Sequence, residues 1–220
     1  MPTDSTPPAA ADRPGSLVIG VLGGIASGKS AVARLLAGPD GVCLSADALA
    51  REALDSPAVL ARVRARFGAR AIGPDGKVDR AYLAERIFAP GEGAELRAEL
   101  ESWTHPPVRA RILELSSTAR AAGVPRIVLD VPLLLENDAR HGLARLCDVL
   151  VFVEADAAER DRRARTERGW TSGEVARREA LQLPLTHKKE RAHHVIVNDR
   201  GLAELERAAV ALRERLTRAR

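Results

Sequence analysis

The stretch LGGIASGKSA places residues that bind phosphate at the spacing that phosphate binding needs. Gly23, Gly28, Lys29 and Ser30 fit the pattern G-x-x-x-x-G-K-[ST]. Glycines let consecutive backbone N–H groups converge on an anion, because no Cβ stands in the way. The lysine of such a loop reaches the β and γ phosphates of a nucleotide, and the hydroxyl after it binds Mg²⁺. The predicted nucleotide contacts are Gly24, Ile25, Ala26, Ser27, Gly28, Lys29, Ser30 and Ala31.

The segments on either side of the glycines support this prediction. SLVIGV before them is aliphatic and β-branched, which predicts a buried strand. SAVARLLAG after them has apolar residues at helical spacing and ends at Gly38-Pro39. A helix that begins at the glycines adds the positive end of its dipole to the phosphate cradle. The alternative is a plain glycine turn between a strand and a helix.

Two aspartates follow predicted strands. Asp47 comes just after the strand in DGVCLS, where it either accepts a hydroxyl proton or caps the next helix. Asp130 ends the strand RIVLD, where it either holds Mg²⁺ through water, orients a substrate, or bonds to the backbone. Parallel sheets bind their ligands at the carboxyl ends of the strands, so both positions are candidate site residues.

The order of elements predicts an α/β fold with a mostly parallel sheet covered by helices on both faces. The block 57–122 lacks strand signals and is predicted to be a helical insertion that forms a substrate-binding cap, with a break at Pro106-Pro107. Asp79 is predicted to cap a helix after the turn 73–79. The segment 1–15 is rich in Pro, Ala and Ser and is expected to be a disordered tail.

The composition of the chain limits the classes of molecule that it is expected to bind. The 220 residues carry a formal net charge of +4, but the arginines are not in one block and aromatics make up only 3%. Base stacking needs aromatic side chains, so no nucleic acid is expected. No apolar stretch reaches the ~18 residues of a membrane span, and the start has no apolar signal region. We therefore expect no membrane partner, a cytoplasmic location, and two buried free thiols at Cys43 and Cys147.

A cluster of arginines lies in ERDRRARTERGW, at positions 160, 162, 163, 165 and 168. A guanidinium can stabilise the charge of a phosphoryl-transfer transition state, but at helical spacing these five cannot all face one site. Trp170 is expected to pack, with stacking on an adenine or an arginine as alternatives. Trp103 is expected to pack in the helical block, and His105, before two prolines, to be a turn residue.

Together these residues resemble the dephospho-CoA kinases, from about Val18 to the end of the chain. The matching pieces are GVLGGIASGKS, SADALARE, GKVDRAYLAERIF, LESWTHPPV, LDVPLLLE, CDVLVFVEA, REALQ and VIVN. The first motif alone indicates only a P-loop, whereas DRAYL…IF, HPPV and DVPLLLE in this order are specific to the family.

The resemblance implies a nucleoside-monophosphate-kinase-like P-loop fold with a core of 16–56, 123–155 and 192–220, an inserted helical CoA domain at 57–122, and a helical lid at 156–191. It implies transfer of the γ-phosphoryl group of ATP to the 3′-hydroxyl of dephospho-CoA, by a monomer or weak homo-oligomer. The implied catalytic residues are Asp47 as base, Lys29 and Arg163. The implied substrate contacts are Asp47, Arg80, His105, Asp130, Pro132 and Leu133; the implied metal ligands are Ser30 and Asp130; Asn198 is implied near the adenine, unless it caps a turn.

The chain departs from the family pattern at several positions. Ala26 stands where the family usually has Gly, and we expect it to fit only with a negative φ. Ser45 replaces the first acid of Asp-x-Asp, the family's lid glutamine is not evident near Arg160, and His193 stands where Asp is common. The alternatives are a kinase for another small alcohol or nucleoside monophosphate, a P-loop switch or nucleic-acid ATPase that uses water, and a degenerate kinase that binds CoA without turnover.

Overall fold

The structure, a computed structural model, describes residues 15–218. The tail predicted at 1–15 lies outside these residues, except for Gly15. The chain divides into two compact units. One comprises the described residues up to Cys43 and from Thr118 onward, and the other is Leu44–Ser117.

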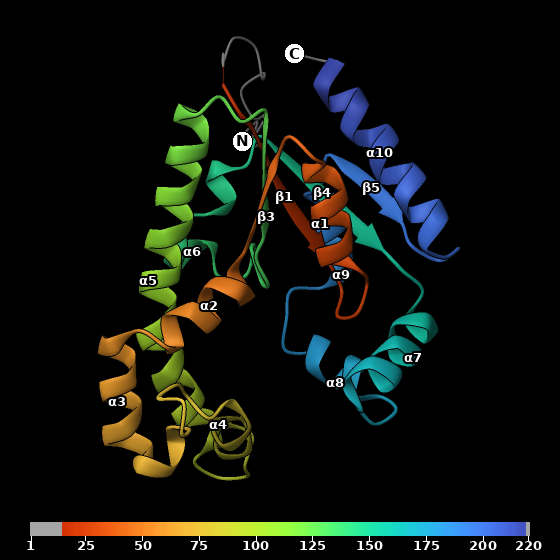
Figure 1. The fold of residues 1–220 in the computed structure, drawn as a ribbon. Helices are drawn as coiled ribbons and strands as arrows, with labels where there is room; N and C mark the ends of the chain where they lie inside the picture. Colours follow the sequence, from red (N-terminus) through yellow and green to blue (C-terminus); the bar gives the residue numbers. More distant parts are fainter. Residues whose placement is uncertain (1–14, 219–220) are drawn as a thin grey trace, which may run out of the picture. The chain divides into compact units, whose positions relative to one another are not determined.

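The first unit contains a parallel sheet whose strand order is β2-β3-β1-β4-β5. β1 pairs in parallel with β3 and β4, and β4 pairs in parallel with β5 (Figure 1). The strands are β1 (Leu17–Gly23), β2 (Val42–Ser45, which crosses into the second unit), β3 (Arg126–Asp130), β4 (Val149–Glu154) and β5 (His194–Val197). The helices are α1 (Lys29–Ala37), α6 (Asp138–His141), η2 (Ala144–Leu146), α7 (Ala157–Arg168), α8 (Glu174–Glu179), α9 (Leu185–Glu190) and α10 (Leu202–Arg218).

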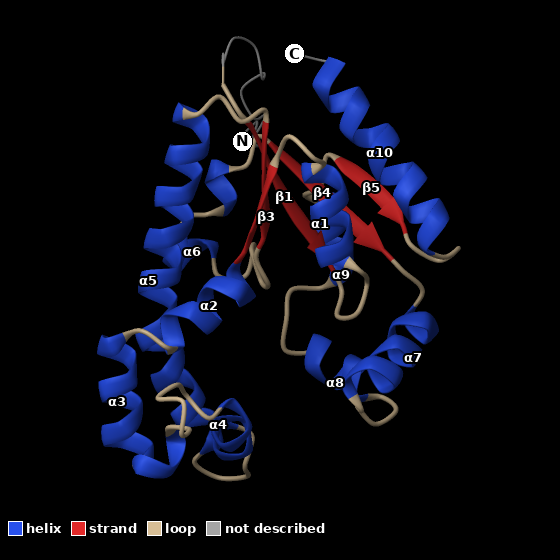
Figure 2. Ribbon diagram, in the orientation of Figure 1, coloured by secondary structure: helices blue, strands red, loops and turns tan. Residues whose placement is uncertain are grey.

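The central strand β1 is buried along its whole length, as its aliphatic sequence predicts. Alternate residues such as Ile19 pack with Val32 of α1 and Ala209 of α10, which lie side by side over the sheet (Figures 1 and 2). The residues between them face the other way. A Cβ at Gly20 would come within 2.8 Å of side-chain atoms of Leu134 and Leu150, so the strand is closely packed on that side also.

The second unit is helical, as was predicted for the block 57–122. Its elements are α2 (Ala46–Leu54), α3 (Pro57–Phe67), η1 (Ala69–Ala71), α4 (Arg80–Ile87) and most of α5 (Gly93–Ala121). Val63, Leu83 and Leu96 belong to its own apolar core, and Trp103 packs against that core as expected. Asp79 caps α4 by accepting the N–H of Tyr82 at 3.0 Å, which confirms the predicted cap.

The break predicted at Pro106-Pro107 is wrong, because α5 runs unbroken through both prolines. Each proline lacks an N–H, so the helix loses two of its own bonds there. Leu100 before the prolines and Ile112 after them are both buried, which shows that one helix face is packed along its length and overrides the local signal. His105 is therefore an exposed helix residue and not the turn residue that was expected.

No described helix is long and apolar enough to cross a membrane.

Candidate active site

The phosphate-binding motif forms the turn between β1 and α1, as predicted. β1 ends at Gly23, with φ 153°, and α1 begins at Lys29 after Gly28, with φ 94°. A Cβ at Gly23 would lie 2.7 Å from both Ser27 Oγ and the carbonyl oxygen of Val153. Both glycines are therefore required by backbone conformation, and Gly23 by space as well. Five loop residues lie between the strand and the N-terminus of the helix, which is the place where backbone N–H groups bind phosphate in such a turn. Within the loop, the N–H of Ile25 is bonded to Glu179 and that of Ser27 to the carbonyl of Gly24.

Ala26 adopts a left-handed backbone with φ 57°. The expectation that alanine fits here only with a negative φ is therefore wrong. A non-glycine residue in this region costs roughly 1–2 kcal/mol. The loop stores this strain at its centre, next to the turn in which the N–H of Ser27 donates to the carbonyl of Gly24 at 3.3 Å.

Lys29 turns its ammonium group back over the loop. Its Nζ donates to the carbonyl oxygens of Gly23, at 3.1 Å, and Gly24, at 2.7 Å. Burial is the main cause that lowers the pKa of Lys29 to about 8, and the positive charges of Lys188 and Arg168 lower it further. The carboxylates of Asp130 and Glu179 act in the opposite direction. Lys29 thus lies among charges of both signs, as expected for a group that handles phosphate.

Asn198 fixes the backbone of the phosphate loop through its side-chain amide. Its side-chain Nδ2 donates to the carbonyl of Ser27 at 2.8 Å, and its own N–H donates to the carbonyl of Glu154 at 2.8 Å. Any Cβ at Gly28 would overlap this amide group. Asn198 is 7% exposed. Its amide therefore positions the phosphate loop, a role that neither of the two readings, adenine contact or turn capping, anticipated.

Three further predicted site residues lie at the end of β3 and in the loop after it. Asp130 is buried at the end of the strand, and its charge acts on both Lys29 and Cys43. Two residues beyond Val131, Leu133 has a positive φ of 54°, a strained backbone of the kind found at binding sites. Pro132 precedes it. Asp130, Pro132 and Leu133 remain predicted substrate contacts.

Both cysteines are free, as predicted, although neither is fully buried. Burial raises the pKa of the Cys43 thiol to about 11 and that of Cys147 to about 12. Neither thiol is a ready nucleophile at neutral pH.

The arginines of the predicted lid face in different directions, as their spacing predicted. Arg163 donates to Glu159 at 2.9 Å and to the carbonyl oxygen of Asn198 at 2.8 Å, so it contacts the residue that supports the loop. Arg162 pairs with Glu159 on the surface. Arg168 is the lid arginine whose charge acts on Lys29. The role of Arg163 at the phosphates remains a prediction.

The ring of Trp170 is in contact with two guanidinium groups. Arg178 lies 4.1 Å and Arg168 5.2 Å from its ring centroid. Of the alternatives for this residue, the structure shows stacking on arginine.

The predicted site residues of the second unit lie on α2, α4 and α5. Asp47 is exposed in the first turn of α2. The cap of that helix is Ser45, whose Oγ accepts the N–H of Ala48 at 3.4 Å, so the capping alternative for Asp47 is wrong. Arg80 donates to Asp55 at 3.0 Å while half of its side chain is exposed. The carboxylate of Asp47 is thus left available for chemistry.

Two residues of the segment 156–191, the predicted lid, were not among the predicted site residues. Lys188 is 3% exposed, and its Nζ lies 2.5 Å from Glu136 and 3.1 Å from the Oε1 of Gln182. Glu179 accepts the N–H of Ile25 in the phosphate loop at 2.6 Å. Both lie in charged helical sequence that is typical of a solvated surface, so composition gave no sign of their contacts.

Mg²⁺ is the metal that the phosphate-loop motif is expected to bind. Among residues 15–218 no cluster of three or more His, Cys, Asp or Glu side chains can hold a metal ion. Mg²⁺ in nucleotide sites, however, takes most of its oxygen ligands from phosphates and water and only one or two from the protein. The Ser30 hydroxyl is exposed in the first turn of α1, and Asp130 ends the neighbouring strand β3. These residues fit Mg²⁺ bound together with a nucleotide.

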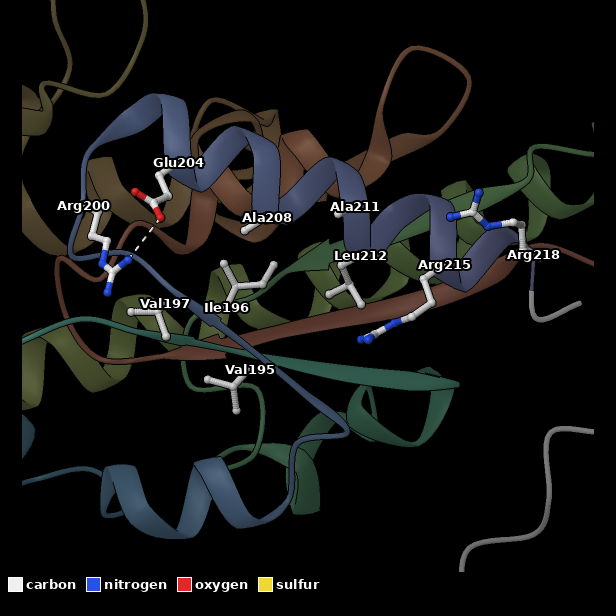
Figure 3. A pocket seen from close by; sticks show the side chains of 10 residues that line it. All are labelled: Val195, Ile196, Val197, Arg200, Glu204, Ala208, Ala211, Leu212, Arg215 and Arg218. Atoms are coloured by element: carbon white, nitrogen blue, oxygen red, sulfur yellow. Dashed lines mark hydrogen bonds and ion pairs between the residues drawn. The ribbon is translucent and has the colours of Figure 1, made fainter.

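A pocket of about 650 Å³ lies elsewhere in the first unit, between the edge strand β5 and α10 (Figure 3). Val195 and Val197 lie along the strand side, and Arg215 and Leu212 on the helix side. No residue of the phosphate loop lines it.

A parallel sheet whose central strand leads through a phosphate-binding loop into a helix, with a half-buried lysine over that loop, is the arrangement found in P-loop kinases. Residues 17–204 match the family described as dephospho-CoA kinase. The chain belongs to this family, which confirms the resemblance drawn from its motifs.

Individual relatives agree with the family match. The dephospho-CoA kinase of Anaeromyxobacter dehalogenans is 41% identical over 82% of this chain and 83% of its own length. That of Corynebacterium diphtheriae is 38% identical over 90% of this chain and 96% of its own length. The crystal structure of TT1252 from Thermus thermophilus superposes with a TM-score of 0.70 at 32% identity, covering 93% of this chain and 98% of that one. The predicted P-loop kinase fold is confirmed.

Proposed function

We propose that this chain transfers the γ-phosphoryl group of ATP to the 3′-hydroxyl of dephospho-CoA and so forms CoA. The observation that carries the proposal is the phosphate loop with its half-buried Lys29, in a chain that matches dephospho-CoA kinases over residues 17–204. The loop is the evidence for a bound nucleotide, and the family match is the evidence for dephospho-CoA as the acceptor. P-loop cores serve many acceptors, so the loop by itself does not select one.

The reaction forms a bond between the 3′-oxygen of dephospho-CoA and the γ-phosphorus of ATP. The bond between that phosphorus and the β,γ-bridging oxygen breaks, and ADP leaves with its electron pair. Asp47 accepts the proton of the 3′-hydroxyl. This role rests on the family motif and on its exposed carboxylate, which does not cap α2. Lys29 leaves the carbonyls of Gly23 and Gly24 and pairs with the phosphates, which neutralises charge as the leaving group departs.

Mg²⁺ belongs to the proposal, with Ser30 and Asp130 as its protein-side partners. When bound there, it would neutralise part of the phosphate charge that builds up during the transfer. Asn198 and Gly28 hold the backbone of the loop so that its N–H groups face the phosphates. Arg163 is proposed to approach the phosphates from the lid; Arg80, His105, Pro132 and Leu133 are proposed to contact the acceptor.

The proposal extends to the location, oligomeric state and partners of the protein and to the divisions of its domain. We propose a cytoplasmic monomer or weak homo-oligomer that acts on small molecules, with neither nucleic acid nor membrane as a partner. The helical substrate insertion at 57–122 and the lid at 156–191 are proposed functional divisions of the domain at 16–220.

The test is acceptor selectivity. The purified protein with Mg²⁺-ATP is given dephospho-CoA, AMP, CMP or no acceptor, and ADP release is measured for each. The proposal expects rapid ADP formation with dephospho-CoA alone. ADP formation with AMP or CMP would indicate another kinase, and release without an acceptor would indicate an ATPase.

A further inference from the structure

The first half of the phosphate loop is in contact with an ion pair from the lid. Oε1 of Glu179, the last residue of α8, accepts the N–H of Ile25 at 2.6 Å and lies 2.5 Å from Nη1 of Arg160 in α7. Arg160 also donates from Nη1 to the carbonyl of Ile25 at 3.4 Å, and from Nε to the carbonyl of Ala155 at 3.2 Å. The side chains of Arg160 and Glu179 are 6% and 15% exposed, so the pair is part of the protein interior.

Gly24 makes room for this pair. A Cβ at Gly24 would lie 2.6 Å from both Arg160 Nη1 and Glu179 Oε1. The pair thus lies flat against the loop at one end, while Asn198 supports the loop at the other. The two supports differ in kind, because Asn198 bonds to a carbonyl, whereas Glu179 bonds to an N–H group.

This difference bears on phosphate binding. The loop binds anions through its backbone N–H groups, and a carboxylate oxygen accepts such a bond in the same way as a phosphate oxygen. An N–H group held by Glu179 is not free for phosphate, and two anions at one donor repel each other. Glu179 also acts on Lys29, whose pKa it raises, so its charge is felt where the phosphates are handled.

We propose that Glu179 is an internal anion of the phosphate loop, which the terminal phosphate of ATP displaces from the N–H of Ile25. In this proposal the terminal phosphate extends from the N-terminus of α1 toward Ile25, which lies in the half of the loop farther from that helix along the chain. Glu179 therefore competes with ATP more than with ADP and lowers the affinity for the triphosphate. The proposal rests on the proposed function only in that the loop binds ATP.

The test is nucleotide binding by calorimetry with Glu179→Gln and no acceptor present. Glutamine keeps the size of the side chain and an oxygen for the Ile25 N–H, but it removes the charge and leaves Arg160 uncompensated beside the phosphates. The dissociation constant of ATP is expected to fall about fivefold, which corresponds to about 1 kcal/mol. That of ADP is expected to change less than twofold.

Glu174→Gln is the matched control. Glu174 lies on the same helix and pairs with Arg177 and Arg178, but it is bonded to its own helix instead of to the loop. It is expected to leave both dissociation constants unchanged. Unchanged or weaker ATP binding in Glu179→Gln would overturn the proposal, because Glu179 would then be a fixed support of the loop. A lower kcat at an unchanged ATP dissociation constant would do the same.

A second measurement reports the displacement itself. Trp170 stacks on Arg178, the residue before Glu179, so departure of Glu179 from the loop disturbs this stack. In a Trp103→Phe background, ATP is expected to change Trp170 emission more than ADP does, and the difference is expected to vanish in Glu179→Gln. Equal changes with ATP and ADP would contradict the proposal.

A second variant covers the case in which Glu179→Gln fails to fold. Glu179→Asp retains the charge but shortens its reach to Ile25, so the dissociation constant of ATP is expected to fall relative to that of ADP, by less than in Glu179→Gln. An unchanged dissociation constant of ATP would overturn the proposal. Binding is read without an acceptor, so a failure of phosphoryl transfer to dephospho-CoA is detected separately.

Discussion

The side-chain amide of Asn198 donates a 2.8 Å hydrogen bond to the carbonyl oxygen of Ser27, so the residue after β5 fixes the backbone of a loop 171 positions earlier in the chain. Removing it leaves that buried carbonyl without its partner, at a cost of about 1–3 kcal/mol. In Asn198→Ala we expect the dissociation constant of ATP to rise about tenfold and the free energy of unfolding to fall.

Calorimetry with ATP and urea denaturation check this prediction. Asn137→Ala is the matched control, because its side chain makes no capping bond to α6. Nucleotide binding that is the same in Asn198→Ala as in the wild type would show that the loop holds its shape without this bond.

The strained alanine at the centre of the loop gives a prediction of opposite sign. Ala26→Gly removes the roughly 1–2 kcal/mol cost of a left-handed φ. It also makes the unfolded chain more flexible, which lowers the free energy of unfolding by roughly 0.4–1 kcal/mol. We expect a net gain of about 0.5 kcal/mol in the free energy of unfolding, measured in urea. Ala31→Gly, inside α1, is the control and is expected to lose stability. Destabilisation by Ala26→Gly would contradict the positive φ of 57°.

Lys29 predicts a pH dependence of nucleotide binding. Its pKa is lowered to about 8, chiefly by burial, in the structure without nucleotide. Bound phosphates favour the charged ammonium, so above pH 8 binding must take up a proton. The ATP dissociation constant is therefore expected to rise with pH above 8, by at most about tenfold per pH unit for a single group.

Titration of ATP at pH 7, 8, 9 and 9.5 measures this dependence. Lys29→Arg is the control, because a guanidinium stays charged over this range and its binding is expected to be nearly flat with pH. A wild-type profile as flat as that of the arginine variant would rule out a lowered pKa for Lys29.

Variants of Asp47 and Ser45 distinguish a catalytic role from a helix-capping role. Ser45 caps α2, whereas Asp47 leaves its carboxylate exposed in the first turn. Asp47→Asn is expected to lower kcat by roughly 10²–10⁴-fold, the usual contribution of a general base. Its free energy of unfolding is expected to change little. Ser45→Ala is expected to cost about 1 kcal/mol of stability.

Steady-state rates and urea denaturation of both variants check this pair of expectations. An unchanged kcat in Asp47→Asn would show that another group takes the proton. A large loss of stability in that variant would show that Asp47 serves the helix after all.

Sequence reasoning predicted the parts of the molecule that depend on neighbouring residues. The strand, glycine turn and helix around Lys29 are local, and so is the cap at Asp79. The parallel sheet follows from the alternation of strands and helices. Family motifs then supplied the acceptor, which no local pattern of residues contains.

Contacts between distant segments could not be predicted. Pro106 and Pro107 signal a break, yet apolar packing on both sides keeps α5 continuous. Lys188 and Glu179 lie in charged helical sequence, and only the fold brings Lys188 to Glu136 and Glu179 to the N–H of Ile25. The backbone of Ala26 was misjudged because the loop forces a conformation that alanine alone disfavours.

The central claim is that the γ-phosphoryl group of ATP reaches the 3′-hydroxyl of dephospho-CoA. The most direct measurement uses ATP labelled in its γ-phosphate, with Mg²⁺ and dephospho-CoA, followed by treatment of the isolated product with a 3′-nucleotidase. We predict label in a product one phosphate heavier than the acceptor, all of it released by the 3′-nucleotidase. Label found as inorganic phosphate, or in a product that resists the 3′-nucleotidase, would contradict the claim.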